Sequence, residues 1–177
     1  MVLGAGFFTT QKSQEVVHTG VQQASSSMEI IGNVYGLTTS ASGLHYVKFT
    51  VGNTAGGTGL DVSKMVVTYT DEQTRSPDVL YSTDTGDTLI TALKGAATTM
   101  DGTGTGKMGE WGIIETINAN GDTLLEPGEQ FVIGVSVPTA TTTVNTPFTI
   151  NLQPSVGAVF ALKKTVPAAI NPVNILY

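Results

Sequence analysis

The segment between residues 118 and 129 contains the residue types and spacing that best fit a metal site. Counted from the first of them, side chains with an oxygen fall at positions 1, 3, 5, 9 and 12: Asn118, Asn120, Asp122, Glu126 and Glu129. A calcium-binding loop places its ligands at this spacing, with a backbone carbonyl at position 7. The spacing predicts one divalent, calcium-like cation on this loop, where it would stiffen the connection between two strands.

Two departures keep a second interpretation of this segment open. Position 1 is Asn118 where calcium loops prefer Asp, and position 6 is Thr123 where they prefer Gly. The pairs Asn120-Gly121 and Pro127-Gly128 form turns in their own right, so the segment is equally typical of a β-hairpin connection. A second acidic group, with less regular spacing, contains Asp84, Asp87 and Asp101.

Residues that could support catalysis are few. The two histidines, His18 and His45, have no neighbouring Ser, Asp or Glu pattern that indicates a triad or a metal triad. The run from Gly102 to Lys107 is rich in Gly but lacks the Gly-Lys-Ser/Thr ending of a phosphate-binding loop, which favours a surface loop. We therefore expect no enzymatic activity.

The composition limits the class of protein further. With 8 Lys and Arg residues and a net charge of −6, the chain lacks the basic clusters that nucleic acid binding needs. Charged residues make up 12% of the chain, about half the usual share, which is typical of a protein that packs against copies of itself. Cysteine is absent, so disulfides and thiolate metal sites are excluded. No apolar run approaches the roughly 18 residues that span a bilayer, so we expect no membrane contact in this form of the chain.

Short β-branched and aromatic runs, separated by turn residues about every ten positions, predict a mainly β fold. Nine strands are expected, at residues 28–35, 44–51, 64–70, 79–83, 111–117, 130–137, 148–153, 159–166 and 173–177. This number indicates an immunoglobulin-like β-sandwich or a partly closed barrel. The Gly-rich stretch 84–108 interrupts the pattern, and residues 89–94 within it fit a short helix or a short strand. We otherwise expect helix mainly in the first quarter of the chain.

That N-terminal helix is expected within residues 1–27, where no Pro occurs and apolar or small residues recur at helical spacing. Its start, Gly4-Ala5-Gly6-Phe7-Phe8 followed by Thr10-Gln11-Lys12, resembles the end of the N-terminal helix in archaellins, the archaeal flagellins. The rest of the chain resembles archaellins only in general character. The similar segments are the Trp111-Gly-Ile-Ile strand, the acidic Gly-Asp loop and the strand from Glu129.

The resemblance implies a structural subunit of the archaeal motility filament, the archaellum. By this analogy Met1 is not the natural start, residues 1–27 are the end of the filament-core helix, and residues 28–177 are the globular β-sandwich. The partners implied are other copies and related archaellins, in a filament outside the cell that a motor rotates for swimming. Candidate helix contacts between subunits are Phe7, Phe8, Val16, Val17 and Val21. The alternative is a type IV pilin-like or adhesin module.

Archaellins are often N-glycosylated, but this chain has no Asn-x-Ser/Thr acceptor, so we expect no such glycan.

Overall fold

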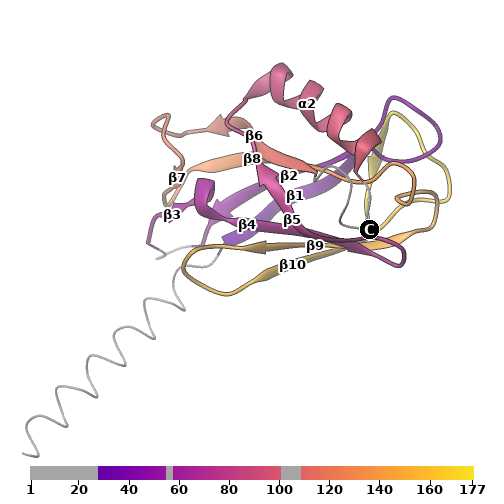
Figure 1. The fold of residues 1–177 in the computed structure, drawn as a ribbon. Coiled ribbons are helices and arrows are strands. Elements are labelled where there is room, and N and C mark those ends of the chain that lie inside the picture. The colour runs from indigo at the N-terminus through magenta and orange to yellow at the C-terminus, as the bar shows by residue number, and fades with distance from the viewer. Residues whose placement is uncertain (1–27, 55–57, 101–108) are drawn as a thin grey trace, which may run out of the picture.

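The computed structural model describes residues 28–54, 58–100 and 109–177, and their main feature is one curled sheet (Figure 1). Its nine strands lie in the order β10-β9-β4-β5-β6-β8-β2-β1-β11. Their bounds are β1 Met28–Leu37, β2 Tyr46–Asn53, β4 Val66–Asp71, β5 Arg75–Tyr81, β6 Glu110–Ile117, β8 Gln130–Ser136, β9 Pro147–Gln153, β10 Phe160–Thr165 and β11 Val173–Ile175. A second sheet pairs β3 (Leu60–Asp61) with β7 (Leu124–Leu125), and a 3-10 helix, η1, covers Val62–Lys64.

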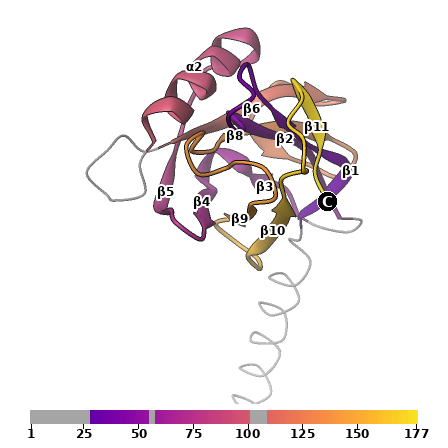
Figure 2. The same cartoon turned by 90° about the vertical axis from the view of Figure 1, so that its right-hand side faces the viewer.

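The sheet curls until its two edge strands meet. The backbone N–H of Thr165, at the end of β10, donates to the carbonyl of Tyr177, just beyond β11, at 3.0 Å. Figure 2 shows β10 and β11 on the same side of the molecule, beside the C-terminus. The mainly β prediction is confirmed, and of the two forms expected the molecule adopts the partly closed barrel.

The nine strands predicted from the sequence are the nine strands of this sheet, with bounds that shift by a few residues. Alternating burial is clear in β9, where Phe148, Ile150 and Leu152 are buried inside the curl and the residues between them are less buried. The two-residue strands β3 and β7 were not predicted, because so short a pairing has no periodicity of its own. The helix expected within residues 1–27 lies outside the described residues.

One strand pair is parallel and requires a long connection. β5 and β6 align Leu80 with Glu110 and Tyr81 with Trp111, whereas every other pair in the sheet is antiparallel. Parallel neighbours cannot be joined by a tight hairpin, and the crossover usually contains a helix. Here that helix is α2, Gly86–Thr99.

The helix α2 lies outside the first quarter of the chain, where most of the helix was expected. It includes residues 89–94, for which helix and strand were left open, and it is longer than either. Its apolar residues recur at helical spacing and are buried: Leu89, Leu93, Ala96 and Ala97. They cover part of the outer face of the sheet, so strand β8 is buried on both faces after its first residue.

Paired glycines allow this close packing. Gly112 on β6 and Gly134 on β8 lie directly opposite each other in the sheet. A Cβ atom on Gly134 would lie 2.6 Å from the Leu93 side chain, and one on Gly112 would lie 3.0 Å from that of Leu89. The two glycines therefore form the flat site on which the two leucines of α2 pack.

Candidate functional site

The loop 118–129 connects β6 to β8, and its polar side chains bind its own backbone. Asn120 Oδ1 accepts from the N–H of Asp122 at 3.0 Å, and Asp122 Oδ1 accepts from the N–H of Leu124 at 2.8 Å. Asn118 and Gly121 have positive φ, 54° and 97°, as tight turns demand. These hydrogen bonds are the Asx type that initiates turns.

The centre of this loop is the buried carboxylate of Glu129. One of its oxygens accepts from the N–H of Asn120 at 3.1 Å, and the other accepts from the N–H of Glu126 at 3.0 Å. The side chain of Glu129 is 7% exposed, whereas Asp122 and Glu126 are exposed. The side chain of Glu126 accepts a long hydrogen bond, 3.4 Å, from the Asn120 amide. Glu129 thus closes the loop by itself.

A second contact joins this loop to η1. Thr123 accepts from the N–H of Val62 through its carbonyl at 2.9 Å, and its hydroxyl donates to Asp61 at 3.3 Å. The hydrogen bond from Ser63 is the main cause that lowers the pKa of Asp61. Asp61 also forms an ion pair with Lys64 at 3.1 Å.

The five predicted ligands lie on one loop, and side-chain oxygens of Asn120, Asp122 and Glu129 accept hydrogen bonds from its backbone. Within the described residues, no three His, Asp or Glu side chains lie close enough together to hold a metal ion. The cation on loop 118–129 stays a prediction. Of the second acidic group, Asp84 lies just before α2 and Asp87 in its first turn, while Asp101 is outside the described residues.

Sequence reasoning missed a buried polar cluster around Asp71, at the turn between β4 and β5. One Asp71 oxygen accepts from the Tyr69 hydroxyl at 2.9 Å and from the Thr141 hydroxyl at 2.6 Å. The other accepts from the backbone N–H of Gln73 at 2.8 Å and of Thr74 at 2.5 Å. The cluster ties the turn to the segment 138–146, and its only sequence signal is the local Asp-x-x-Thr pattern of the turn.

The histidine in the described region is also structural. His45 is 5% exposed, and its Nδ1 lies 2.8 Å from the hydroxyl of Thr38. No carboxylate is among its hydrogen-bond partners in the described part of the chain. Desolvation by burial, and then the positive charge of Lys94, lower the pKa of His45 below its ordinary value of 6.5.

We expect His45 to make the fold less stable in acid. Because its pKa is lowered in the folded state, the unfolded chain binds more protons just below pH 6.5, so stability is lost as pH falls through that window. Urea unfolding at pH 7.5 and pH 5.5 measures this loss, and His45→Gln should lose less stability between the two pH values than the wild type. An equal loss in both proteins would show that carboxylates alone cause the pH dependence.

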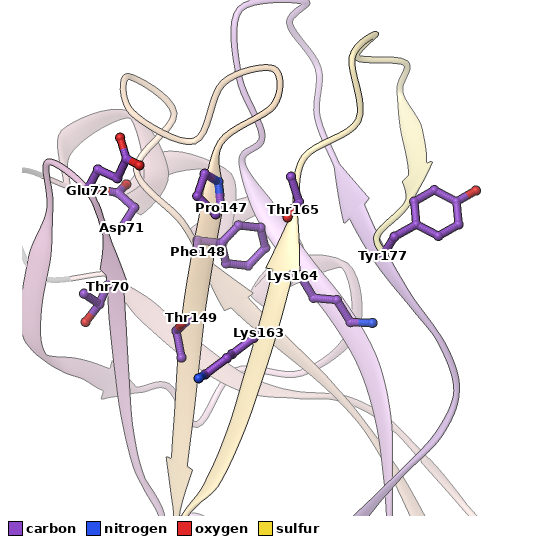
Figure 3. A pocket seen from close by; sticks show the side chains of 10 residues that line it. All are labelled: Thr70, Asp71, Glu72, Pro147, Phe148, Thr149, Lys163, Lys164, Thr165 and Tyr177. Carbon is purple, nitrogen blue, oxygen red and sulfur yellow. The ribbon is translucent and has the colours of Figure 1, made fainter.

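Two of the surface hollows have charged residues in their linings. The first lies between β4, β9 and β10 beside the C-terminus, and Figure 3 shows its lining. It contains Phe148, Lys163, Lys164 and Tyr177. The second lies between the start of α2, β6 and the 118–129 loop. Neither contains a nucleophile beside a histidine, which is the arrangement that acyl transfer needs.

Comparison with known proteins decides the family. A family model described as archaeal-type flagellin matches residues 1–163. "Probable flagellin 1" of Archaeoglobus fulgidus is 31% identical over 184 residues, which cover 99% of this chain and 83% of that protein. The chain belongs to the archaeal-type flagellin family. "Probable flagellin 2" of the same organism is 32% identical over 182 residues, covering 94% of this flagellin and 78% of the relative.

Solved structures share the fold of this flagellin. The archaeal flagellum of Methanospirillum hungatei strain JF1 superposes with a TM-score of 0.62 at 23% identity, covering 99% of this chain and 85% of the other. Flagellin FlaB1 of Methanocaldococcus jannaschii gives a TM-score of 0.63 at 18% identity, covering 84% and 95%.

Family membership confirms the resemblance drawn from the N-terminal motif. This flagellin is a structural subunit of the archaeal flagellum, the archaellum. The candidate subunit contacts Phe7, Phe8, Val16, Val17 and Val21 lie outside the described residues. In the ranges that are described, no helix combines the length and the apolar character needed to cross a bilayer.

Proposed function

We propose that this flagellin assembles with copies of itself and with related archaellins into a filament outside the cell, which a motor rotates for swimming. The observation that carries the proposal is the family match over residues 1–163, which includes both the N-terminal segment and most of the β-barrel. The work is mechanical, and no side chain has a catalytic role. The low share of charged residues, 12%, suits a surface that packs against other subunits.

The two parts of the chain would divide this work. Residues 1–27 supply the end of a helix in the filament core, with Phe7 and Phe8 among the contacts between subunits. Residues 28–177 form the barrel that covers the outside of the filament. A stable barrel without disulfides depends on its core, in which 26 buried hydrophobic residues of the described ranges form one cluster.

Expression in an archaeon that lacks its own archaellins tests the proposal. We expect filaments by electron microscopy and swimming by video tracking from the complete gene, and neither from Phe7→Asp/Phe8→Asp. Circular dichroism of the purified double variant should show the same β content as the wild type, because both changes lie outside the barrel. Filaments from the double variant would contradict the assigned role of the N-terminal segment.

We also propose that the 118–129 loop binds a calcium-like cation that stiffens the connection between β6 and β8. An ion that binds only the folded state stabilises it by about 2.7 kcal/mol at a hundredfold excess over its dissociation constant. Glu129 is a poor probe, since its loss would strand two backbone N–H groups with or without an ion. Glu126→Gln and Asp122→Asn remove exposed charges and are better probes.

The cation proposal is tested by measuring the Tm of thermal unfolding in calcium and in chelator. Each variant should lower Tm in calcium and change it little in chelator, since carboxylate charge governs calcium affinity. Asp84→Asn/Asp87→Asn is the matched control at the second acidic group and should behave as wild type. Wild-type protein with the same Tm in calcium and chelator would mean that the loop is an ordinary turn.

A further inference from the structure

One end of the barrel presents an exposed aromatic ring together with two amines. Tyr177 is 82% exposed, and Lys163 and Lys164 occupy the edge strand β10 beside it. In Figure 3, Lys164 points toward Tyr177 and Lys163 points to the other side of β10. Within the described residues, the ion pair of Lys64 with Asp61 is the single one found, so neither amine has a carboxylate at contact distance there. We call these three residues the lysine edge. Asp71 and Glu72 lie on β4 and its turn, across the hollow from the lysine edge.

A second surface is acidic. A groove of about 460 Å³ runs between the start of α2, β6 and the 118–129 loop. Its apolar lining residues are Tyr81, Ile113 and Ile114, and its acidic ones are Asp84, Glu115 and Asp122. No Lys or Arg is among the residues that line it. We call this the acidic groove.

The acidic groove lies where a strand is missing from the sheet. Among the described residues, β5 pairs with β6 only at Glu110 and Trp111, and no described strand pairs with the later residues of β6 on that side. The chain turns away after Ser82, whose N–H donates to the carbonyl of Trp111 at 2.8 Å. The floor of the groove is therefore a part-buried apolar surface, which a partner side chain can cover.

The two surfaces face opposite ends of the molecule. In Figure 1, α2 begins on the left, above the end of β6, whereas the turn between β4 and β5 and the C-terminus lie on the right. A contact between two different patches of the same chain is heterologous. Repeated from copy to copy, it generates a ring or an open helical filament.

We propose that the lysine edge of one copy of this flagellin docks in the acidic groove of the next. Tyr177 covers the apolar floor near Tyr81 and Ile114, while Lys164, on the Tyr177 side of β10, faces the carboxylates of Asp84, Glu115 and Asp122. Lys163 adds positive charge from the other side of the strand. Tyrosine is an effective anchor at such contacts, because it buries a large rigid surface and keeps a polar tip. The charge complementarity selects a second copy as the occupant, because both halves of the contact are on this chain. The inference rests on the proposed filament function.

Cysteine trapping tests the contact directly, because the chain has no cysteine of its own. Cells that assemble the flagellin would carry Lys163→Cys and Asp122→Cys in the same chain, and their filaments would be treated with a short thiol-to-thiol crosslinker. We expect a ladder of dimers, trimers and longer products on a denaturing gel. Each single variant should remain a monomer, as should the control pair Lys64→Cys/Asp122→Cys.

Charge reversal gives an independent measurement. Lys163→Glu/Lys164→Glu should reduce the number of filaments per cell at least tenfold, and adding Glu115→Lys/Asp122→Lys should restore most of them. The matched control Lys64→Glu/Arg75→Glu changes the net charge equally, and should leave the number near the wild-type value. If the double-cysteine variant does not assemble, charge reversal alone tests the contact between the lysine edge and the acidic groove.

Several outcomes would overturn the inference. They are wild-type filaments without a ladder, dimers from a single-cysteine variant, or reversal variants that assemble normally. Dimers from Lys163→Cys alone would indicate that two lysine edges meet each other. A wild-type chain that forms no filaments would instead contradict the proposed function, so the two failures are distinguishable.

Discussion

Replacing Trp111 with alanine is expected to lower the free energy of unfolding of the barrel by about 3–5 kcal/mol. Trp111 is the largest fully buried side chain, at 1% exposed, and its ring lies 4.9 Å from that of Tyr81 between centroids. The substitution removes this ring pair and leaves a cavity where β5 and β6 run parallel. Small domains have 5–15 kcal/mol of stability in total, so the variant should unfold at markedly lower urea.

The measurement requires a probe other than fluorescence, because Trp111 is the single tryptophan. Far-ultraviolet circular dichroism against urea is suitable. The matched control is Leu80→Ala on the same pair of strands, since Leu80 is 53% exposed and should change stability by less than about 0.5 kcal/mol. Equal losses in the two variants would contradict the placement of Trp111 in the core.

Replacing Asp71 with alanine is expected to cost about 2–4 kcal/mol, because charged hydrogen bonds are lost and buried donors are stranded. The carboxylate accepts from two hydroxyl groups, of Tyr69 and Thr141, and from two backbone N–H groups. Tyr69 has no exposed surface, and burial strongly raises the pKa of its hydroxyl, which therefore stays a donor. The loss should free the β4–β5 turn from the segment 138–146.

Two controls isolate the role of the Asp71 carboxylate. Asp71→Asn keeps one acceptor oxygen and should lose less stability than Asp71→Ala. Glu72→Ala removes an exposed carboxylate from the next position, and should leave stability within about 0.5 kcal/mol of wild type. Hydrogen exchange of the β4–β5 turn should rise in Asp71→Ala. Unchanged exchange there would show that the cluster does not hold the turn.

The Asp71 cluster also has a consequence for assembly. Asp71 and Phe148 are partners in the β4–β9 register, and Lys164 pairs with Phe148 from β10. Phe148 itself stacks on Tyr69 with ring centroids 5.8 Å apart. Phe148 thus contacts the buried Tyr69 and is also the strand partner of Lys164. Loss of the Asp71 hydrogen bonds should therefore disturb the position of the lysine edge and weaken the proposed contact between copies.

The sequence by itself determined the fold class, the nine strands of the main sheet and the family. Each of these depends on local information. Alternation within six to ten residues shows which side of a strand is buried, as for Phe148, Ile150 and Leu152. The family signal came from a contiguous N-terminal motif, and the shortage of catalytic residue types is a matter of composition. The helix α2 was not decided by the sequence, because residues 89–94 fit a short helix or a short strand and the rest of the helix lies in a Gly-rich stretch.

Only the tertiary structure decided how these elements meet. The edge strands close through the hydrogen bond from Thr165 to Tyr177, and a two-residue pairing joins β3 to β7 across more than sixty residues of chain. Asp71 and Thr141 are 70 positions apart and form one hydrogen bond. Glu129, with the right spacing for a cation ligand, turns into its own loop because two backbone N–H groups there need an acceptor. Such long-range contacts cannot be predicted from a stretch of ten residues, because they depend on which surfaces the folded chain brings together.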